Sequence, residues 1–100
     1  MSSLKIKHEE VKLKFSAKLI LLAVEDFYLC FMEDAELLSE VLEYPLERKV
    51  VDGDEMYVSG FPDYMLDTNL PILVNRLGRV ALIYDTDKIT QEINRDIYGR

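Results

Sequence analysis

The stretch LILLAVEDFYLCFM, residues 19–32, contains twelve apolar residues among fourteen, interrupted only by Glu25 and Asp26. A helix that crosses a membrane needs about 20 apolar residues, whereas fourteen residues at about 1.5 Å each reach only about 21 Å. The stretch is therefore too short for a membrane anchor. Its apolar side chains fill a wide arc at about 100° per residue, and Ser16 before it is a good N-cap, which predicts a long helix buried on most sides.

Leu22 and Leu29 do not fit the buried side of this predicted helix. They lie seven residues apart, and on a helical wheel they fall within the stripe that carries Lys18, Glu25 and Asp26. We therefore expect both leucines to face outward. They are either ordinary exposed side chains or a contact with another element or with a second copy of the chain.

Local patterns predict further elements on both sides of this stretch. In residues 4–15 apolar side chains alternate with lysines, which predicts either a strand pair with a turn near His8 or one longer strand with a bulge there. An amphipathic helix is the alternative. Asp34 is placed to cap a short helix that ends before Pro45. The remaining expected elements are a hairpin around Asp52 and Gly53, a helix over residues 67–77, a strand over residues 79–85 and a helix over residues 89–97.

The order of these elements favours an α+β fold. One hundred residues suit a single domain, and 49% hydrophobic residues supply its core. We expect one domain over residues 1–100, in which a mostly antiparallel sheet packs against a long apolar helix and two or three shorter helices. Cys30 is the one cysteine, so no intramolecular disulfide forms and the cytoplasm is the expected location.

Charge is distributed in blocks along the chain, whose net charge is −7. Residues 1–18 carry a local excess of bases, whereas residues 19–46 carry seven acids and no Lys or Arg. Nucleic-acid binding depends on neutralising phosphates, so this acidity predicts no direct contact with DNA or RNA. A protein with a basic surface is the expected partner, and the simpler alternative is that the acidic block only keeps the protein soluble.

These features predict a small binding protein without catalysis that masks a partner surface, as inhibitors, immunity proteins, antitoxins and phage counter-defence proteins do. The alternative is a homo-oligomeric structural or accessory subunit, and a homodimer is one form of it. We expect acids to attract the partner and the loop around residues 59–66 to grip it with aromatic side chains. The predicted partner-binding residues are Leu22, Leu29, Glu33, Asp34, Glu36, Glu40, Glu43, Phe61, Tyr64 and Met65.

The run VALIYDTDK, residues 80–88, is the strongest candidate for chemistry. It places Asp85 and Asp87 at the end of an apolar strand, a pattern that locally resembles haloacid-dehalogenase-like phosphatases and implies a magnesium-dependent phosphate-handling enzyme as a distant alternative. Only a short chain follows the motif, and capping of the last helix explains both aspartates more simply. His8 has no second ligand cluster beside it, so we expect no catalytic residue, metal or cofactor.

Overall fold

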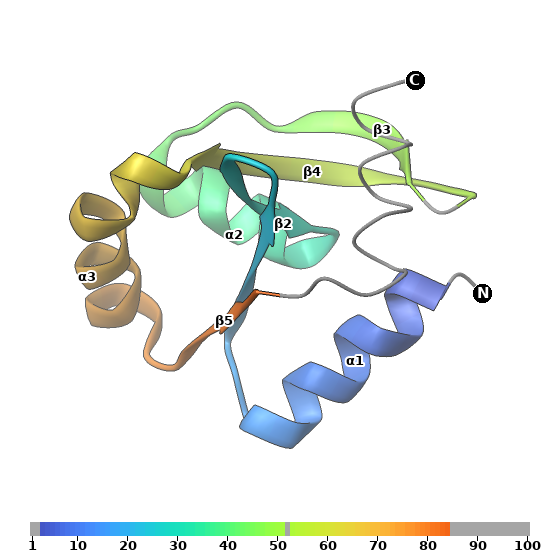
Figure 1. Cartoon of the computed structure of the whole chain (residues 1–100), viewed down its shortest axis with the longest axis horizontal. Helices are drawn as coiled ribbons and strands as arrows, with labels where there is room; N and C mark the ends of the chain where they lie inside the picture. Colours follow the sequence, from blue (N-terminus) through green and yellow to red (C-terminus); the bar gives the residue numbers. More distant parts are fainter. Residues whose placement is uncertain (1–2, 52, 85–100) are drawn as a thin grey trace.

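A computed structural model describes residues 3–51 and 53–84 of the chain. These residues form a mixed five-stranded sheet with three α-helices around it, which confirms the α+β class (Figure 1). In chain order the elements are α1 (Ser3–Phe15), β1 (Leu19–Val24), β2 (Phe27–Phe31), α2 (Glu33–Leu42), β3 (Glu47–Val51), β4 (Asp54–Pro62), the 3-10 helix η1 (Asp63–Met65), α3 (Leu66–Leu77) and β5 (Val80–Ile83).

The strands lie in the order β3-β4-β2-β1-β5. β1 runs parallel to β5, while the other three pairings are antiparallel. Within the described residues, no helix is both long and apolar enough to cross a membrane.

The long apolar helix predicted over residues 19–32 is wrong, because this stretch forms the hairpin of β1 and β2. Both strands are inner strands of the sheet and are buried on both faces, so their apolar residues are continuous rather than alternating. Glu25 and Asp26 make the two-residue turn, and Glu25 adopts a positive φ of 57°. Leu22 and Leu29 are paired across this hairpin and buried, which corrects the expectation that they face outward.

The strand pair predicted over residues 4–15 is also wrong, and the alternative of a helix is confirmed by α1. Lys, Glu and Leu are strong helix formers, and here their propensity prevails over the apparent alternation of apolar side chains. Ser16 was expected to cap a following helix. Instead it lies just after α1 with a φ of 51°, which turns the chain toward β1.

The elements after residue 32 match the prediction more closely. The short helix, the hairpin of β3 and β4, the next helix and the strand β5 all form. Gly53 (φ 84°) and Gly78 (φ 96°) supply the positive φ values that the hairpin turn and the end of α3 require. The helix expected over residues 89–97, together with Asp85 and Asp87, lies outside the described residues.

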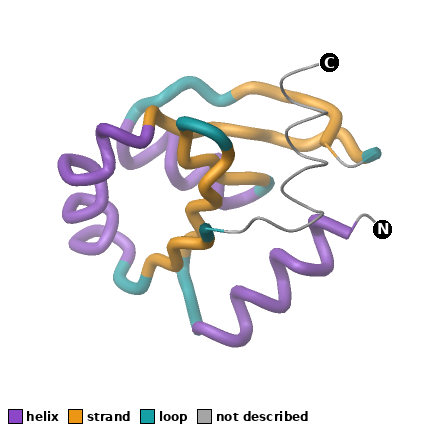
Figure 2. Tube along the Cα trace, viewed as in Figure 1, coloured by secondary structure: helices purple, strands orange, loops and turns teal. Residues whose placement is uncertain are grey.

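Apolar side chains bury both faces of the sheet. On one face, α2 and α3 pack through Ala35, Leu38 and Leu73 against Leu21 and Phe61. Figure 2 shows the two helices beside the strands. The buried cluster on the other face comes from the strands alone in the part of the chain described, and consists of Leu22, Val24, Leu29, Phe31, Val51, Met56 and Val58.

Candidate functional site

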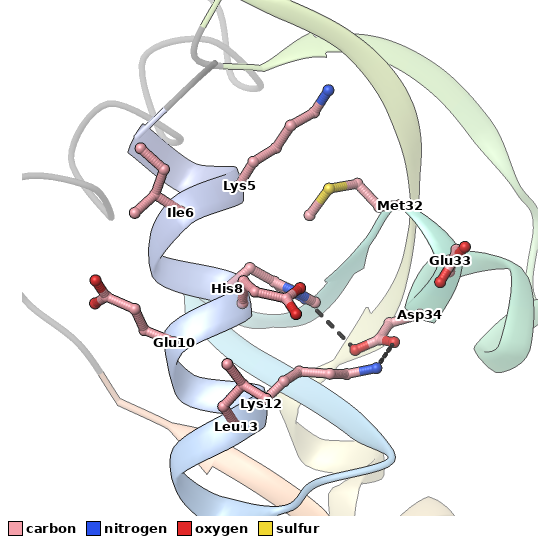
Figure 3. A pocket seen from close by; sticks show the side chains of 10 residues that line it. Lys5, Ile6, His8, Glu10, Lys12, Leu13, Met32, Glu33 and Asp34 are labelled. Atoms are coloured by element: carbon pink, nitrogen blue, oxygen red, sulfur yellow. Dashed lines mark hydrogen bonds and ion pairs between the residues drawn. The ribbon is translucent and has the colours of Figure 1, made fainter.

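A hollow of about 850 Å³ lies between α1 and the start of α2 (Figure 3). Lys5, His8 and Lys12 line it from α1, and Met32 and Asp34 line it from the opposite wall. Met32 has φ 62° and ψ −132°, a backbone conformation that is found almost only in glycine. Its main-chain N–H donates to the carbonyl of Tyr57, which holds this unusual turn against β4.

Asp34 is the centre of an ionic cluster in this hollow. Its side chain is only 1% exposed, and its Oδ1 accepts a hydrogen bond from Lys12 Nζ at 2.6 Å. Its Oδ2 accepts a hydrogen bond from the main-chain N–H of Ile20 at 2.9 Å. The carboxylate thus joins α1, β1 and α2, because each of these elements contributes one group to the cluster. This arrangement is typical of a structural ion pair, since both carboxylate oxygens are already engaged.

His8 completes the cluster without a hydrogen bond of its own. Its Nε2 lies 3.4 Å from Asp34 Oδ2, but it is buried and no described residue forms a hydrogen bond with it. Burial lowers the pKa of His8 below its ordinary value of 6.5, and the negative charge of Asp34 opposes this shift only in part. Burial therefore favours the neutral form of the imidazole.

Cys30 is a buried residue of the core. Burial raises the pKa of the Cys30 thiol well above its usual range, and its Sγ donates to the carbonyl of Ile20 at 3.3 Å. Within residues 3–51 and 53–84, no group of three or more His, Cys, Asp or Glu side chains is placed to hold a metal ion.

A second and smaller hollow, about 250 Å³, lies along β2, β4 and β3. Phe27, Leu29, Val58 and Gly60 line it together with the side chain of Lys49. A Cβ at Gly60 would clash with the carbonyl oxygen of Tyr28 and would lie 2.6 Å from Leu29 Cδ2. Glycine is therefore required here, and it lets the Leu29 side chain lie flat in the groove.

Phe27 stands at the mouth of this groove with 38% of its surface exposed. It is the first residue of β2, directly after the tight turn at Glu25 and Asp26, and it pairs with Pro62 of β4. The main-chain N–H of Asp63 donates to the carbonyl of Asp26 at 2.8 Å, which ties the turn to η1. The fold thus presents an aromatic ring to solvent from a well-supported hairpin.

The structure separates the residues that we predicted to bind a partner. Phe61 is not in an exposed loop but lies in β4, 1% exposed, with the rings of Tyr28 and Tyr44 at centroid distances of 5.8 and 5.7 Å. Asp34 is buried, whereas Tyr64 is 79% exposed. Met65 is half-buried, and the exposed acids of α2 and its C-cap are Glu33, Glu36, Glu40 and Glu43.

Phe27 was absent from the predicted site because it fell within the buried arc of a helix that does not form. One signal was available in the sequence. Glu25 and Asp26 are two polar residues between two β-prone apolar runs, which is the spacing of a tight hairpin, and the residue that follows such a turn stands at the end of the sheet.

The model of one protein family, MutS domain I, matches residues 4–99 of the chain. Three relatives share the description DNA mismatch repair protein MutS. The protein of Christiangramia forsetii is 36% identical over 76 residues, which cover 76% of this chain and 9% of that protein. The protein of Porphyromonas gingivalis is 41% identical over 75 residues, which cover 73% of this chain and 8% of that protein. The protein of Salinibacter ruber is 31% identical over 96 residues, which cover 91% of this chain and 11% of that protein. The chain therefore spans about a tenth of the length of these relatives.

These matches overturn the function that the sequence suggested. A protein-masking inhibitor of phage or immunity type is wrong, because the matched domain comes from proteins of DNA mismatch repair. The expectation of a basic protein partner and of no direct nucleic-acid contact is contradicted for the same reason. Since the family model matches residues 4–99 and one relative is 41% identical over 73% of the chain, the chain belongs to the MutS domain I family.

Proposed function

We propose that this chain is a DNA-binding domain of a mismatch-repair protein of the MutS type, and that it contacts DNA through Phe27 and the groove beside it. The observation that carries the proposal is the match to MutS domain I over residues 4–99. The exposed ring of Phe27 at the end of the β1–β2 hairpin supports it, because its position suits contact with a large flat partner such as a base.

Aromatic side chains bind nucleic acids by stacking on bases, and apolar wedges also enter between base steps and kink the duplex. A mismatched base costs less energy to unstack than a paired one, so an aromatic wedge favours DNA at a mismatch. Phe27 meets the mechanical requirement for a wedge. Its strand is hydrogen-bonded on both sides, and the preceding turn is held by the Asp63–Asp26 main-chain bond.

The groove next to Phe27 favours contact by shape. Leu29, Val58 and Gly60 present apolar or main-chain surface, and Lys49 beside them is paired with Glu47, its Nζ lying 3.3 Å from Glu47 Oε1. We therefore expect the groove to accept the sugar or base edge of a distorted step through van der Waals contact.

We also propose that the domain acts by binding alone and not as an enzyme. The most buried carboxylate, Asp34, is already bonded to Lys12 and Ile20, so its role in the fold is structural. A domain of this kind works where DNA is accessible, which is compatible with the cytoplasmic location expected from the single cysteine.

The test is a fluorescence-anisotropy titration of the chain with a labelled duplex that contains one mismatch and with the matched duplex. We expect tighter binding to the mismatched duplex. Phe27→Ala should weaken that binding by roughly 5- to 150-fold, because stacking on one base contributes about 1–3 kcal/mol. Tyr57→Ala is the matched control, since Tyr57 is a half-exposed aromatic on β4 whose side chain faces away from the groove.

Two results would contradict the proposal. One is an unmodified chain that binds neither duplex at low salt. The other is a Phe27→Ala variant that keeps the affinity and the mismatch preference of the unmodified chain, because the ring would then play no part in binding.

A further inference from the structure

A charged surface lies at the end of the sheet opposite the β1–β2 turn. Here α1 ends, β1 begins, and the link from α3 to β5 passes close by, at the lower side of the view (Figure 1). The main-chain N–H of Lys18 donates to the carbonyl of Arg79 at 2.8 Å, and Arg79 Nη1 donates to the carbonyl of Phe15 at 3.3 Å. These bonds hold segments that are about 60 residues apart in the sequence in one corner.

This corner is positive in an otherwise acidic protein. Residues 11–24 and 68–84, which both pass through this corner, contain five bases and no Asp or Glu, although the whole chain has 19 acids and 12 bases. The bases are Lys12, Lys14, Lys18, Arg76 and Arg79.

The side chains of the corner combine charge with an exposed ring. Lys14, Phe15, Lys18 and Arg79 are all exposed, and Lys14 Nζ lies 5.5 Å from the centroid of the Phe15 ring. A shallow hollow of about 230 Å³ lies between Phe15, Arg79 and β5. Cations beside an exposed aromatic ring are a combination that nucleic-acid-binding surfaces use repeatedly.

Stabilisation of helix ends accounts for only part of this charge. Cations near a helix C-terminus offset its partial negative charge, and Arg79 does so at the end of α1. Lys12 is also engaged, because its Nζ bonds Asp34 and the carbonyl of Lys18. Lys14 and Lys18, in contrast, form no ion pair with any acid of residues 3–51 and 53–84.

We propose that this basic corner, defined by Lys14, Phe15, Lys18 and Arg79, binds the phosphate backbone of DNA as a second contact distinct from Phe27. The inference rests on the proposed function and extends it. β1 separates the two contacts, and its six residues span about 20 Å at about 3.3 Å each.

A phosphate contact positions the protein but carries no sequence information. The corner therefore contributes equally to matched and mismatched DNA, and the discrimination between them comes from Phe27. This division of roles also explains how a chain with a net charge of −7 binds a polyanion, since the positive charge is concentrated where the phosphates lie.

The test is the salt dependence of DNA binding by the variant Lys14→Gln/Lys18→Gln. The slope of log K against log salt should become smaller by roughly 1.8, because each phosphate contact contributes about 0.9. Affinity for matched and mismatched duplexes should fall by the same factor, so the ratio between them stays constant. Both lysines are exposed, so the thermal midpoint should not change.

Lys7→Gln/Arg48→Gln is the matched control, because it removes the same charge from exposed positions outside the corner and should leave the slope nearly unchanged. If the corner variant keeps the slope of the unmodified chain, the corner does not contact DNA, and an acidic protein surface becomes the better partner. Loss of affinity for mismatched DNA alone would also overturn the inference. If the unmodified chain binds no DNA, the proposed function itself fails. This result differs from an unchanged salt slope and from a loss of affinity for mismatched DNA alone, which overturn only the inference about the corner.

Discussion

The helices are attached to the sheet in two different ways. α2 and α3 place Leu38 and Leu73, each 0% exposed, in the apolar core beneath the sheet. α1 instead leaves Ile6 and Leu13 exposed and is joined to its neighbours by the Lys12–Asp34 ion pair. Apolar packing is insensitive to pH, whereas an ion pair depends on protonation and on geometry. The docking of α1 is therefore the part of the fold that solution conditions can change.

The largest effect is expected from the apolar attachment. Leu38→Ala leaves a cavity beneath the sheet and should lower the free energy of unfolding by about 4 kcal/mol, within the usual range for a buried leucine. Urea denaturation followed by circular dichroism measures this loss. Ile72→Ala on the exposed side of α3 is the control and should cost far less, because Ile72 is 41% exposed. An equal loss in the free energy of unfolding for both variants would mean that burial of Leu38 does not attach α2 to the sheet.

An intermediate effect is expected at the ionic attachment. Asp34→Asn removes the charge that Lys12 and His8 face and should lower the free energy of unfolding by about 3 kcal/mol, since breaking a buried pair leaves a charge without its partner. Adding Lys12→Met to this variant should restore part of the loss, which a double-mutant cycle measures. Glu55→Gln is the control, because the Arg48–Glu55 pair is exposed and should contribute under about 1 kcal/mol.

The smallest effect is expected from pH. Because burial lowers the pKa of His8, the unfolded chain binds a proton more readily than the folded one. The free energy of unfolding is therefore highest above pH 6.5, the ordinary pKa of His8 in the unfolded chain. It decreases as the pH falls from there through the lower pKa of His8 in the folded chain. His8→Gln should flatten this dependence in denaturation measured between pH 7.5 and 5. A stability that rises as pH falls over this window would show that Asp34 outweighs burial.

Two parts of the chain differ in how well local sequence predicts them. Signals within a few residues define α2, the β3–β4 hairpin and α3, such as Gly53 in the turn and Gly78 after the last helical residue. Residues 19–32 carry a single weaker local signal, the two acids of the turn, Glu25 and Asp26. A continuous apolar run has the same pattern in a buried strand as in a buried helix, and only pairing with β4 and β5 distinguishes them.

The candidate site was less predictable than the fold. Phe27, which we propose as the DNA contact, and Phe61, which we predicted as a contact, are both aromatic residues near turn-forming residues. Phe61 is buried because it pairs with Tyr28 and because α2 and α3 pack over it. Phe27 directly precedes Tyr28 in the chain, but it lies at the exposed end of the groove. Exposure of a strand residue depends on what covers that face of the sheet, which is not a local property.

By itself, the sequence determined the α+β class, the later helices and strands, and the concentration of bases in its first 18 residues. These properties follow from composition, capping residues and turn residues that act over short distances. Only the tertiary structure decided that residues 19–32 pair as inner strands, that Asp34 is buried against Lys12, and that Arg79 joins the lysines near the end of α1. The physical reason is that hydrogen bonds between strands and the burial of charges link residues distant in the chain, whose interaction no local pattern records.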